Sequence, residues 1–425
     1  MIESFFWILW TLWMAEALAA AVNAGLFGLL RRRQDRRLAE ALDPERQRAV
    51  ALIVPVKGFD PDLTPRFFRG LLSQQYRRYR LIVTMESDED PVFAWLTDEL
   101  KVDPESLKGS AAETLEKRES GPMDVSFVFA GECEGRGQKV HNQLAAFGEL
   151  EEGDEIVAFA DADIYCPPDW LARLVAPVNL GTHPVSSTYR WLIPRRNSPP
   201  NILASVINGS VASLGGWEAW NVLWGGSMAV ARGTFDELDV PALFAGSLND
   251  DLRLAKEVRS RGKPIAFVRS LMMPSPVDFT WEGLFEFGRR QYYQVRRFSP
   301  TLFKVAHLLT LVYTLGFLTA LYAVGAMENF RAWVPIGFVT VCDQLRGYFR
   351  QRMQRTLFDD ETAVVLARNA WIEHLATPVW MGLHALLVLS AWFVRTIRWA
   401  GIEYRVVSPG ETVVVRRAPG ADSDE

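Results

Sequence analysis

Two aspartates separated by one residue, Asp161 and Asp163, directly follow a mostly apolar run at 155–160. Carboxylates at this spacing can share one Mg²⁺ or Mn²⁺ ion, which neutralises a diphosphate that must leave with extra negative charge. A single aspartate after a strand is often only a turn former, so the signal lies in the spaced pair. The pair predicts a site for a metal ion and a diphosphate.

Two adjacent aspartates, Asp250 and Asp251, open a helical pattern at 251–260. Acidic residues are favourable in the first turn of a helix, so Asp250 can be explained as a helix cap. The alternative is chemical, because a hydroxyl that attacks a carbon centre needs an ionised carboxylate to take its proton. The residues alone leave both interpretations open.

A glycine-containing loop precedes a helical pattern at Lys139 and Asn142. Glycines before a helix start suit phosphate oxygens, although an ordinary helix entry has the same pattern. Pro55 and Lys57 close the first expected strand, where they either contact a nucleotide or turn the chain.

Aromatic residues alternate with arginines at 281–298, immediately before an apolar run. This pattern predicts an amphipathic helix whose arginines meet lipid headgroups. Gln294 and Arg297 are three residues apart and therefore share one face of that helix.

Short apolar runs alternate with helical patterns between residues 50 and 269, which predicts a mostly parallel sheet. Strands are expected at 50–56, 80–85, 125–129, 155–160, 223–231 and 265–269, and helices at 65–74, 139–150, 169–176, 200–214 and 251–260. Ligands of such sheets bind beyond the carboxyl ends of the strands, where 55–58, 86–90 and 161–163 fall. The polar stretch 103–123 is expected to be a surface insertion.

Hydrophobic residues make up 49% of the 425-residue chain and concentrate at its two ends. Residues 5–30 have about the ~20-residue length that crosses a bilayer and are followed by Arg31, Arg32 and Arg33. A secretory signal carries its positive charges before the apolar run, so this order predicts a retained anchor. The positive-inside rule then places the middle of the chain in the cytoplasm.

Two later apolar runs, 305–326 and 375–394, are also expected to span the membrane. Between them, 333–341 is too short to cross, and arginines at 346, 350, 352 and 355 make its continuation basic. With three spans in total this basic segment would face outside, against the charge rule. A re-entrant or interfacial segment is the alternative, and the number of spans stays open.

Composition excludes several classes of protein. A formal net charge of -5 argues against a nucleic-acid partner, because such proteins carry a clustered basic face. The three cysteines and five histidines show no metal-ligand or redox spacing, so a zinc site is not expected. The acidic tail after Arg417 is expected to be disordered.

The clusters occur in a fixed order at 54–63, 71–76, 86–91, 135–142, 161–163, 225–229, 250–256, 294–298 and 399–404. In this order they resemble the family 2 glycosyltransferases, and most of all the ceramide glucosyltransferase type, which includes bacterial hopanoid-associated members. The resemblance implies an α/β catalytic domain of the GT-A type (a Rossmann-like, mostly parallel sheet) with N- and C-terminal transmembrane helices. It also implies a UDP-sugar donor, Mg²⁺ or Mn²⁺, and inverting transfer to a lipid hydroxyl.

Carried over by position, Asp161 and Asp163 would hold the metal, and Asp251 would be the base. The substrate-binding residues implied in this way are Pro55, Lys57, Glu86, Lys139, Asn142, Asp161, Asp250, Gln294, Arg297 and Phe298. Two departures from the family pattern concern this set. Glu86 is favoured over Ser87 or Asp88 where an aspartate is usual, and Phe298 replaces a tryptophan.

We therefore expect a multi-pass protein of the bacterial inner membrane with a cytoplasmic catalytic domain. It would move a hexose, glucose being favoured, from a UDP-sugar to a ceramide-like lipid, a diacylglycerol or a hopanoid. The expected parts are an anchor (1–48), a catalytic domain (49–275), an interfacial segment (276–300), a membrane region (301–404) and a tail (405–425). The rivals are a processive polysaccharide synthase of the cellulose or hyaluronan type and an inert membrane scaffold with the same fold.

Overall fold

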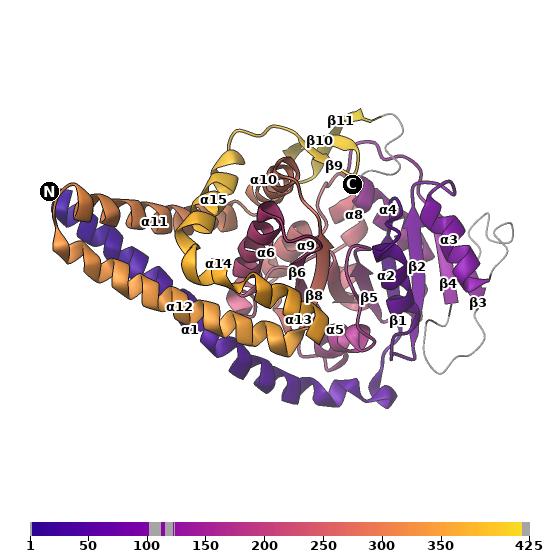
Figure 1. The fold of residues 1–425 in the computed structure, drawn as a ribbon. Helices are drawn as coiled ribbons and strands as arrows, with labels where there is room; N and C mark the ends of the chain where they lie inside the picture. Colours follow the sequence, from indigo (N-terminus) through magenta and orange to yellow (C-terminus); the bar gives the residue numbers. More distant parts are fainter. Residues whose placement is uncertain (1, 102–111, 115–121, 123, 419–425) are drawn as a thin grey trace. The chain divides into compact units, whose positions relative to one another are not determined.

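The computed structural model describes residues 2–101, 112–114, 122 and 124–418 (Figure 1). The expected insertion at 103–123 lies almost wholly outside these residues, as does the end of the acidic tail. The chain divides into two compact units. The sheet unit consists of Gln34–Arg190, Gly215–Ser275 and Arg395–Glu425, and the helical unit of Met1–Arg33, Trp191–Leu214 and Pro276–Val394.

The main sheet of the described residues has eight strands in the order β3-β4-β2-β1-β5-β7-β6-β8. They are β1 (Val50–Pro55), β2 (Tyr79–Met85), β3 (Ala112–Thr114), β4 (Asp124–Phe129), β5 (Ile156–Ala160), β6 (Val185–Pro194), β7 (Ser227–Ala231) and β8 (Ile265–Val277). Strands β4, β2, β1 and β5 are parallel, whereas β7 runs antiparallel to both β5 and β6. The expected α/β fold is confirmed, with a parallel centre in a mixed sheet.

Alternate residues of the central strands face opposite sides of the sheet, so both faces are covered by helices. Leu52 and Val54 face one core, together with side chains of α2, α3 and α5, and Ala51 and Ile53 face the other, with α4 and α9. The helices of the sheet unit are α2 (Leu63–Leu72), α3 (Pro91–Leu100), α4 (Gln138–Ala146), α5 (Trp170–Asn179), α7 (Arg232–Glu237), α8 (Val240–Phe244) and α9 (Asp251–Ser260), with 3-10 turns η1 (Ala39–Leu42), η2 (Pro44–Arg46), η4 (Phe147–Glu149) and η5 (Glu218–Trp220).

A second, three-stranded sheet belongs to the same unit and is formed by β9 (Ile397–Trp399), β10 (Ile402–Ser408) and β11 (Glu411–Arg417). Ala400 and Gly401, both with positive φ, make the tight turn between β9 and β10. Residues 395–404, which we assigned to a membrane region, and 405–417, assigned to a tail, are therefore a β-structure of the sheet unit.

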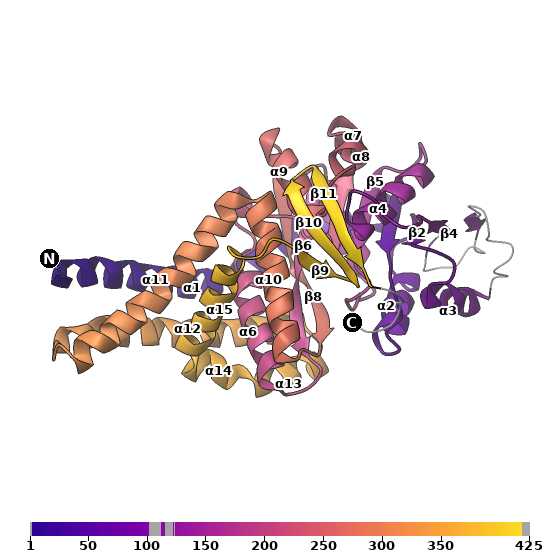
Figure 2. The same cartoon turned by 90° about the horizontal axis from the view of Figure 1, so that it is seen from above.

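The helical unit is shown from two directions in Figures 1 and 2. Its helices are α1 (Ile2–Leu38), α6 (Pro199–Ala212), α10 (Trp281–Phe298), α11 (Pro300–Gly325), η6 (Phe330–Ala332), α12 (Trp333–Leu357), α13 (Asp360–Arg368), α14 (Ala370–Leu375) and α15 (Thr377–Ser390). Among the described residues, the segments Glu3–Leu42 and Pro300–Gly325 are long and apolar enough to cross a membrane.

The expected third span at 375–394 is not one helix. The chain breaks at Ala376 between α14 and α15, and α15 has only 14 residues. Conversely, the segment judged too short at 333–341 continues into α12, a helix of 25 residues. The apolar run ends before the first arginines, whereas the helix continues through them to Leu357.

Candidate active site

The spaced aspartates lie at the edge of the sheet where the parallel strands end. Ala160, the last residue of β5, pairs with Ser227, the first residue of the antiparallel β7. Asp161 therefore lies next to the glycines that lead into β7, and its backbone N–H donates to the carbonyl of Gly226 at 3.2 Å. Strand order thus brings two motifs more than 60 residues apart in sequence to the carboxyl ends of the parallel strands, which is where open α/β sheets bind their ligands.

Lys139 joins the two acidic clusters. Its Nζ lies 2.7 Å from Asp161 Oδ1 and 3.0 Å from Asp250 Oδ2, in a largely buried position. Burial alone would lower the pKa of Lys139, but Asp161 and Asp250 together raise it well above its usual range. This lysine is therefore held as a cation by two carboxylates.

Asp250 is part of this cluster and does not cap α9. Its side chain makes no capping hydrogen bond, whereas Asn249 Oδ1 accepts from the backbone N–H of Leu252 at 2.8 Å. Gln143 Nε2 donates to Asp250 Oδ2 at 2.8 Å. Burial opposes the ionisation of Asp250, but Lys139 and Gln143 outweigh it and lower its pKa. Asp250 is therefore a buried anion.

Asp251 differs from its neighbour. Its Oδ2 accepts from the backbone N–H of Gly225 at 3.0 Å. Burial, followed by the negative charge of Asp250, raises the pKa of Asp251 to about 6, although Lys139 opposes the shift. Two neighbouring carboxylates with pKa values pushed apart suit different tasks, and the one near neutrality suits proton transfer.

The metal-ligand set expected here is Asp161 with Asp163. Arg190 contacts Asp163 Oδ2 at 3.0 Å, and Asp163 Oδ1 is buried without a hydrogen-bond partner. Burial raises the pKa of Asp161 despite its contact with Lys139, so an added cation would stabilise its ionised form. The described residues hold no cluster of three or more potential ligand side chains. Two carboxylates nevertheless fit Mg²⁺, which usually takes its remaining ligands from phosphates and water.

The expected nucleotide side forms a second charged group. Glu86 contacts Lys57 at 3.4 Å and Arg417 of β11 at 2.9 Å, while Asp88 is exposed. The geometry therefore favours Glu86 over Asp88 as the inward carboxylate. Arg417 Nη2 also donates to Gln138 Oε1 at 2.9 Å, which links the hairpin to the start of α4.

The remaining residues expected on this side occupy the same edge of the sheet. Pro55 ends β1 opposite Thr84 of β2. Asn142 is buried on α4, one turn after Lys139, and accepts from Gln138 Nε2 at 2.8 Å. Asn142 thus supports the start of α4 with its side-chain oxygen.

Close glycine contacts hold the two clusters together. A Cβ on Gly137 would lie 2.8 Å from the carbonyl oxygen of Leu248, and one on Gly225 would lie 2.5 Å from Asp250 Oδ2. A Cβ on Gly226 would lie 2.8 Å from Asp161 Oδ2. The glycine loop before α4 is therefore explained by its close approach to the segment that carries Asp250.

Gln294, Arg297 and Phe298 lie on α10, an 18-residue helix as expected. Gln294 and Phe298 are buried within the protein, and the Arg297 guanidinium lies 5.4 Å from the ring centroid of Tyr293. These residues belong to the helical unit, and their role in substrate binding stays a prediction.

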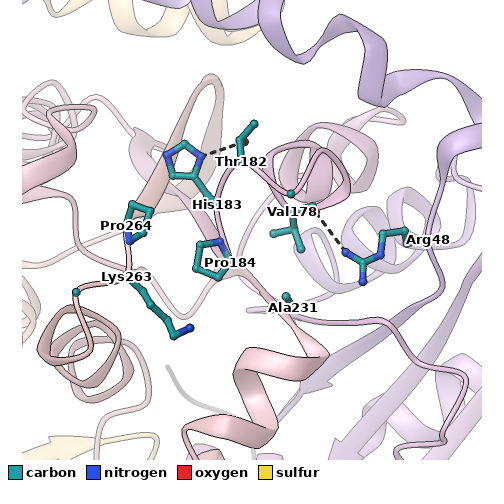
Figure 3. Close-up of a pocket in the computed structure, with 10 residues that line it drawn as sticks. Arg48, Val178, Thr182, His183, Pro184, Ala231, Lys263 and Pro264 are labelled. Carbon is teal, nitrogen blue, oxygen red and sulfur yellow. Dashed lines mark hydrogen bonds between the residues drawn. The ribbon is translucent and has the colours of Figure 1, made fainter.

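Figure 3 shows a pocket of about 440 Å³ in the sheet unit. It is lined by residues at the opposite ends of β6, β7 and β8, including Arg48 and Lys263. Arg48 pairs with Glu155 at 3.1 Å and Lys263 with Glu237 at 2.8 Å, so both positive charges are already neutralised within the protein. None of the expected site residues lines this pocket.

Sequence reasoning missed several residues of the site. Gln143 follows Lys139 by four residues and could have been found from helical spacing. Gly225 and Gly226 were noted as part of the resemblance but given no role. Arg190 and Arg417 carry no local signal, because only strand pairing and the C-terminal hairpin bring them near Asp163 and Glu86.

Comparison with known proteins gives the class. Residues 118–413, more than half of the chain, match the family model of glycosyl transferase family 21. The protein is a glycosyltransferase, as expected. It belongs to glycosyl transferase family 21, which confirms the resemblance to the ceramide glucosyltransferase type, while the bacterial branch stays a prediction.

No curated protein matches the chain. Among solved structures, residues 1–349 of S. aureus TarS with UDP share 12% identity over 88% of this chain and 100% of that one, with a TM-score of 0.36. The same fragment with UDP-GlcNAc gives 13% identity over 87% and 100%, with a TM-score of 0.35. GalNAc-T7 with UDP, GalNAc and Mn²⁺ gives 11% over 60% and 52%, with a TM-score of 0.37. These likenesses are too low to bear on substrate or metal.

Proposed function

We propose that this glycosyltransferase moves a hexose, glucose being favoured, from a UDP-sugar to a hydroxyl of a membrane lipid with inversion at the anomeric carbon. The lipid would be ceramide-like, a diacylglycerol or a hopanoid. The catalytic domain would face the cytoplasm of a bacterium, because Arg31, Arg32 and Arg33 follow the apolar part of α1.

The donor would bind at the carboxyl edge of the sheet. Lys57 and Glu86 would contact the nucleotide, and Lys139 would supply a permanent positive charge between Asp161 and Asp250. Asp161 and Asp163 would hold Mg²⁺ or Mn²⁺, which when bound neutralises the departing diphosphate. Arg190, which contacts Asp163, would keep that carboxylate oriented.

Asp251 would act as the general base. With a pKa of about 6, Asp251 is mostly ionised at pH 7 and can accept a proton. Its carboxylate would take the proton of the acceptor hydroxyl while that oxygen bonds to the anomeric carbon and the carbon–oxygen bond to the diphosphate breaks. The Gly225 N–H, which donates to Asp251 Oδ2, would hold the carboxylate in place for this transfer.

The observation that carries the lipid acceptor is the exposure of the two long apolar helices. Only 28% of the most apolar window of each is buried, whereas a core helix of a soluble protein would be buried over most of its length. Leucines along α11, such as Leu308, Leu318 and Leu321, are exposed and would form a large apolar surface in contact with water. A bilayer would cover these faces and also deliver the acceptor.

The test is a transfer assay with membranes that contain the protein. Several UDP-sugars and a total lipid extract are supplied, and new glycolipids are identified by mass spectrometry. Asp251→Asn should retain UDP binding and lose transfer, whereas Asp236→Asn, at an exposed aspartate in the same unit, should leave transfer unchanged. Full activity of Asp251→Asn would remove the base assignment.

The same assay separates the rival functions. A polymeric product would indicate a processive synthase rather than one-step transfer to lipid. UDP binding without turnover of any UDP-sugar in the presence of Mg²⁺ or Mn²⁺ would indicate an inert scaffold.

A further inference from the structure

The path of the chain restricts how often it can cross a membrane between residues 276 and 394. Ser275 and Arg395 both belong to the sheet unit, which is one compact body. Because one compact body cannot be divided by a bilayer, both residues lie on the same side of the membrane. Tyr404 and Arg417 of the hairpin contact Gln138 at 3.1 and 2.9 Å, so the returning chain is packed into that body. The number of crossings between these points is therefore even.

Helix length decides which segments can cross. With 26 residues α11 is about 39 Å long, and with 25 residues α12 is about 37 Å, both longer than the ~30 Å hydrocarbon layer. With 14 residues α15 reaches about 21 Å. If α11 crosses once, α12 is the helix long enough to return.

The charges of α12 do not prevent this, because they face the inside of the helical unit. Asp343 and Arg346 pair at 2.8 Å, and Arg350 contacts Glu373 at 3.5 Å, with all four side chains buried. Paired, inward-facing charges are the form in which membrane helices carry ionisable residues.

The outward face of α12 is apolar over a long stretch. Trp333, Val334, Phe338, Val341, Leu345 and Tyr348 are all at least 40% exposed. Arg352 and Arg355 follow on the exposed side at the end of the helix, where long basic side chains can reach headgroups.

Contacts with α1 align the three long helices. Trp10 Nε1 donates to Thr319 Oγ1 of α11 at 3.2 Å, and Trp13 packs on Gly316 of the same helix. Gly25 packs on Phe349 of α12, and Arg31 Nη1 donates to the Thr356 carbonyl at 3.5 Å. Helix α1 is thus antiparallel to α11 and parallel to α12. Figures 1 and 2 both place the N-terminus at the same end as the connection from α11 to α12.

This alignment places the basic residues of α1 and α12 at the same end of the helical unit. The arginine run that begins at Arg31 lies level with the last turn of α12, so Arg352 and Arg355 lie on the same side as the anchor's positive charges. The positive-inside rule opposed spans at 5–30, 305–326 and 375–394, but it is satisfied when α12 crosses in place of 375–394.

We propose that α12 spans the bilayer antiparallel to α11, that the connection between them lies on the far side from the sheet unit, and that α15 enters the apolar layer without crossing it. The lipid-facing surface of α12 is the outward row of residues from Trp333 to Tyr348. The inference rests on the membrane location in the proposed function and does not depend on the transfer reaction.

Single cysteines report the side of each loop in sealed vesicles treated with a membrane-impermeant maleimide. Met327→Cys lies after α11, Glu361→Cys after α12, and Ser408→Cys in the hairpin of the sheet unit. All three positions are exposed, while the native Cys133, Cys166 and Cys342 are buried, so the parent protein gives the background. The sheet-unit side is defined by Ser408→Cys.

Met327→Cys should be labelled from the face opposite to Ser408→Cys, and Glu361→Cys from the same face as Ser408→Cys. Labelling of Met327→Cys and Glu361→Cys from one face would overturn the crossing of α12. Release of the protein by an alkaline carbonate wash would overturn the membrane location itself, and transfer by the released protein would show that the glycosyltransferase function still stands.

Discussion

Replacing Asp250 by asparagine should move the acid limb of the pH–activity profile to lower pH. Burial and the negative charge of Asp250 raise the pKa of Asp251 from 3.8 to about 6. The pKa of Asp250 itself is lowered, so its charge is present across that whole window. Asp250→Asn removes this charge and leaves both the burial and the opposing charge of Lys139 in place. The pKa of Asp251 should therefore fall.

The size of the shift follows from the contributions to the pKa of Asp251. A displacement of about two units corresponds to ~3 kcal/mol, and burial is the largest contribution. The charge of Asp250 comes next, so its removal should lower the pKa of Asp251 by on the order of one unit. Protonation of Asp251 would then stop transfer about one pH unit lower than in the parent protein.

The assay is kcat/KM for transfer in detergent solution from about pH 4.5 to 8, because this ratio reports the pKa of the free enzyme. The parent limb should have its midpoint near pH 6. The maximum rate of Asp250→Asn will fall as well, since Lys139 loses a partner, but the midpoint is independent of the plateau. An unchanged or raised midpoint would refute the assignment of Asp251 as the titrating base, and Asp236→Asn serves as the control.

Three further substitutions probe the packing of the site. Lys139→Met leaves two buried carboxylates without their cation and should lower the free energy of unfolding by ~3–5 kcal/mol, measured by denaturant titration, with Lys139→Arg less affected. Arg417→Ala should weaken UDP binding about tenfold (~1.4 kcal/mol) in calorimetry, whereas Arg416→Ala, exposed on the same strand, should not. Gly225→Ala places a carbon 2.5 Å from Asp250 Oδ2 and should reduce kcat about 100-fold, while Gly148→Ala, with nothing within 4 Å, should be neutral.

Much of the sheet unit could be predicted because its elements have strong local patterns. The helix expected at 251–260 is α9 with the same bounds, and β1, β2, β4 and β5 begin and end within one residue of expectation. Strand β6 was missed, since its sequence from Val185 mixes serine, threonine and arginine and lacks a two-residue alternation. Its position between β7 and β8, with a neighbouring strand on each side, stabilises it instead.

The membrane region was predicted less well for a physical reason. Hydropathy averages over all faces of a helix, so the arginines of α12 hid a helix whose outward face is apolar. The run at 375–394 misleads in the opposite way. Its mean hydropathy is that of a membrane span, but the helix is interrupted at Ala376. Neither the direction of a side chain nor its partner can be obtained from an average.

The sequence by itself determined which carboxylates exist, their order, and the strand ends and helix starts on which they lie, because these depend on local composition and spacing. Spacing alone gave no physical difference between Asp250 and Asp251, and only the resemblance to the family assigned Asp251 as the base. Tertiary structure made them different: Lys139, 111 residues earlier, neutralises Asp250, while Asp251 keeps a raised pKa beside the Gly225 N–H. Such contacts between distant segments depend on the packing of α4, α9 and β7 around one edge of the sheet, and no local pattern encodes them.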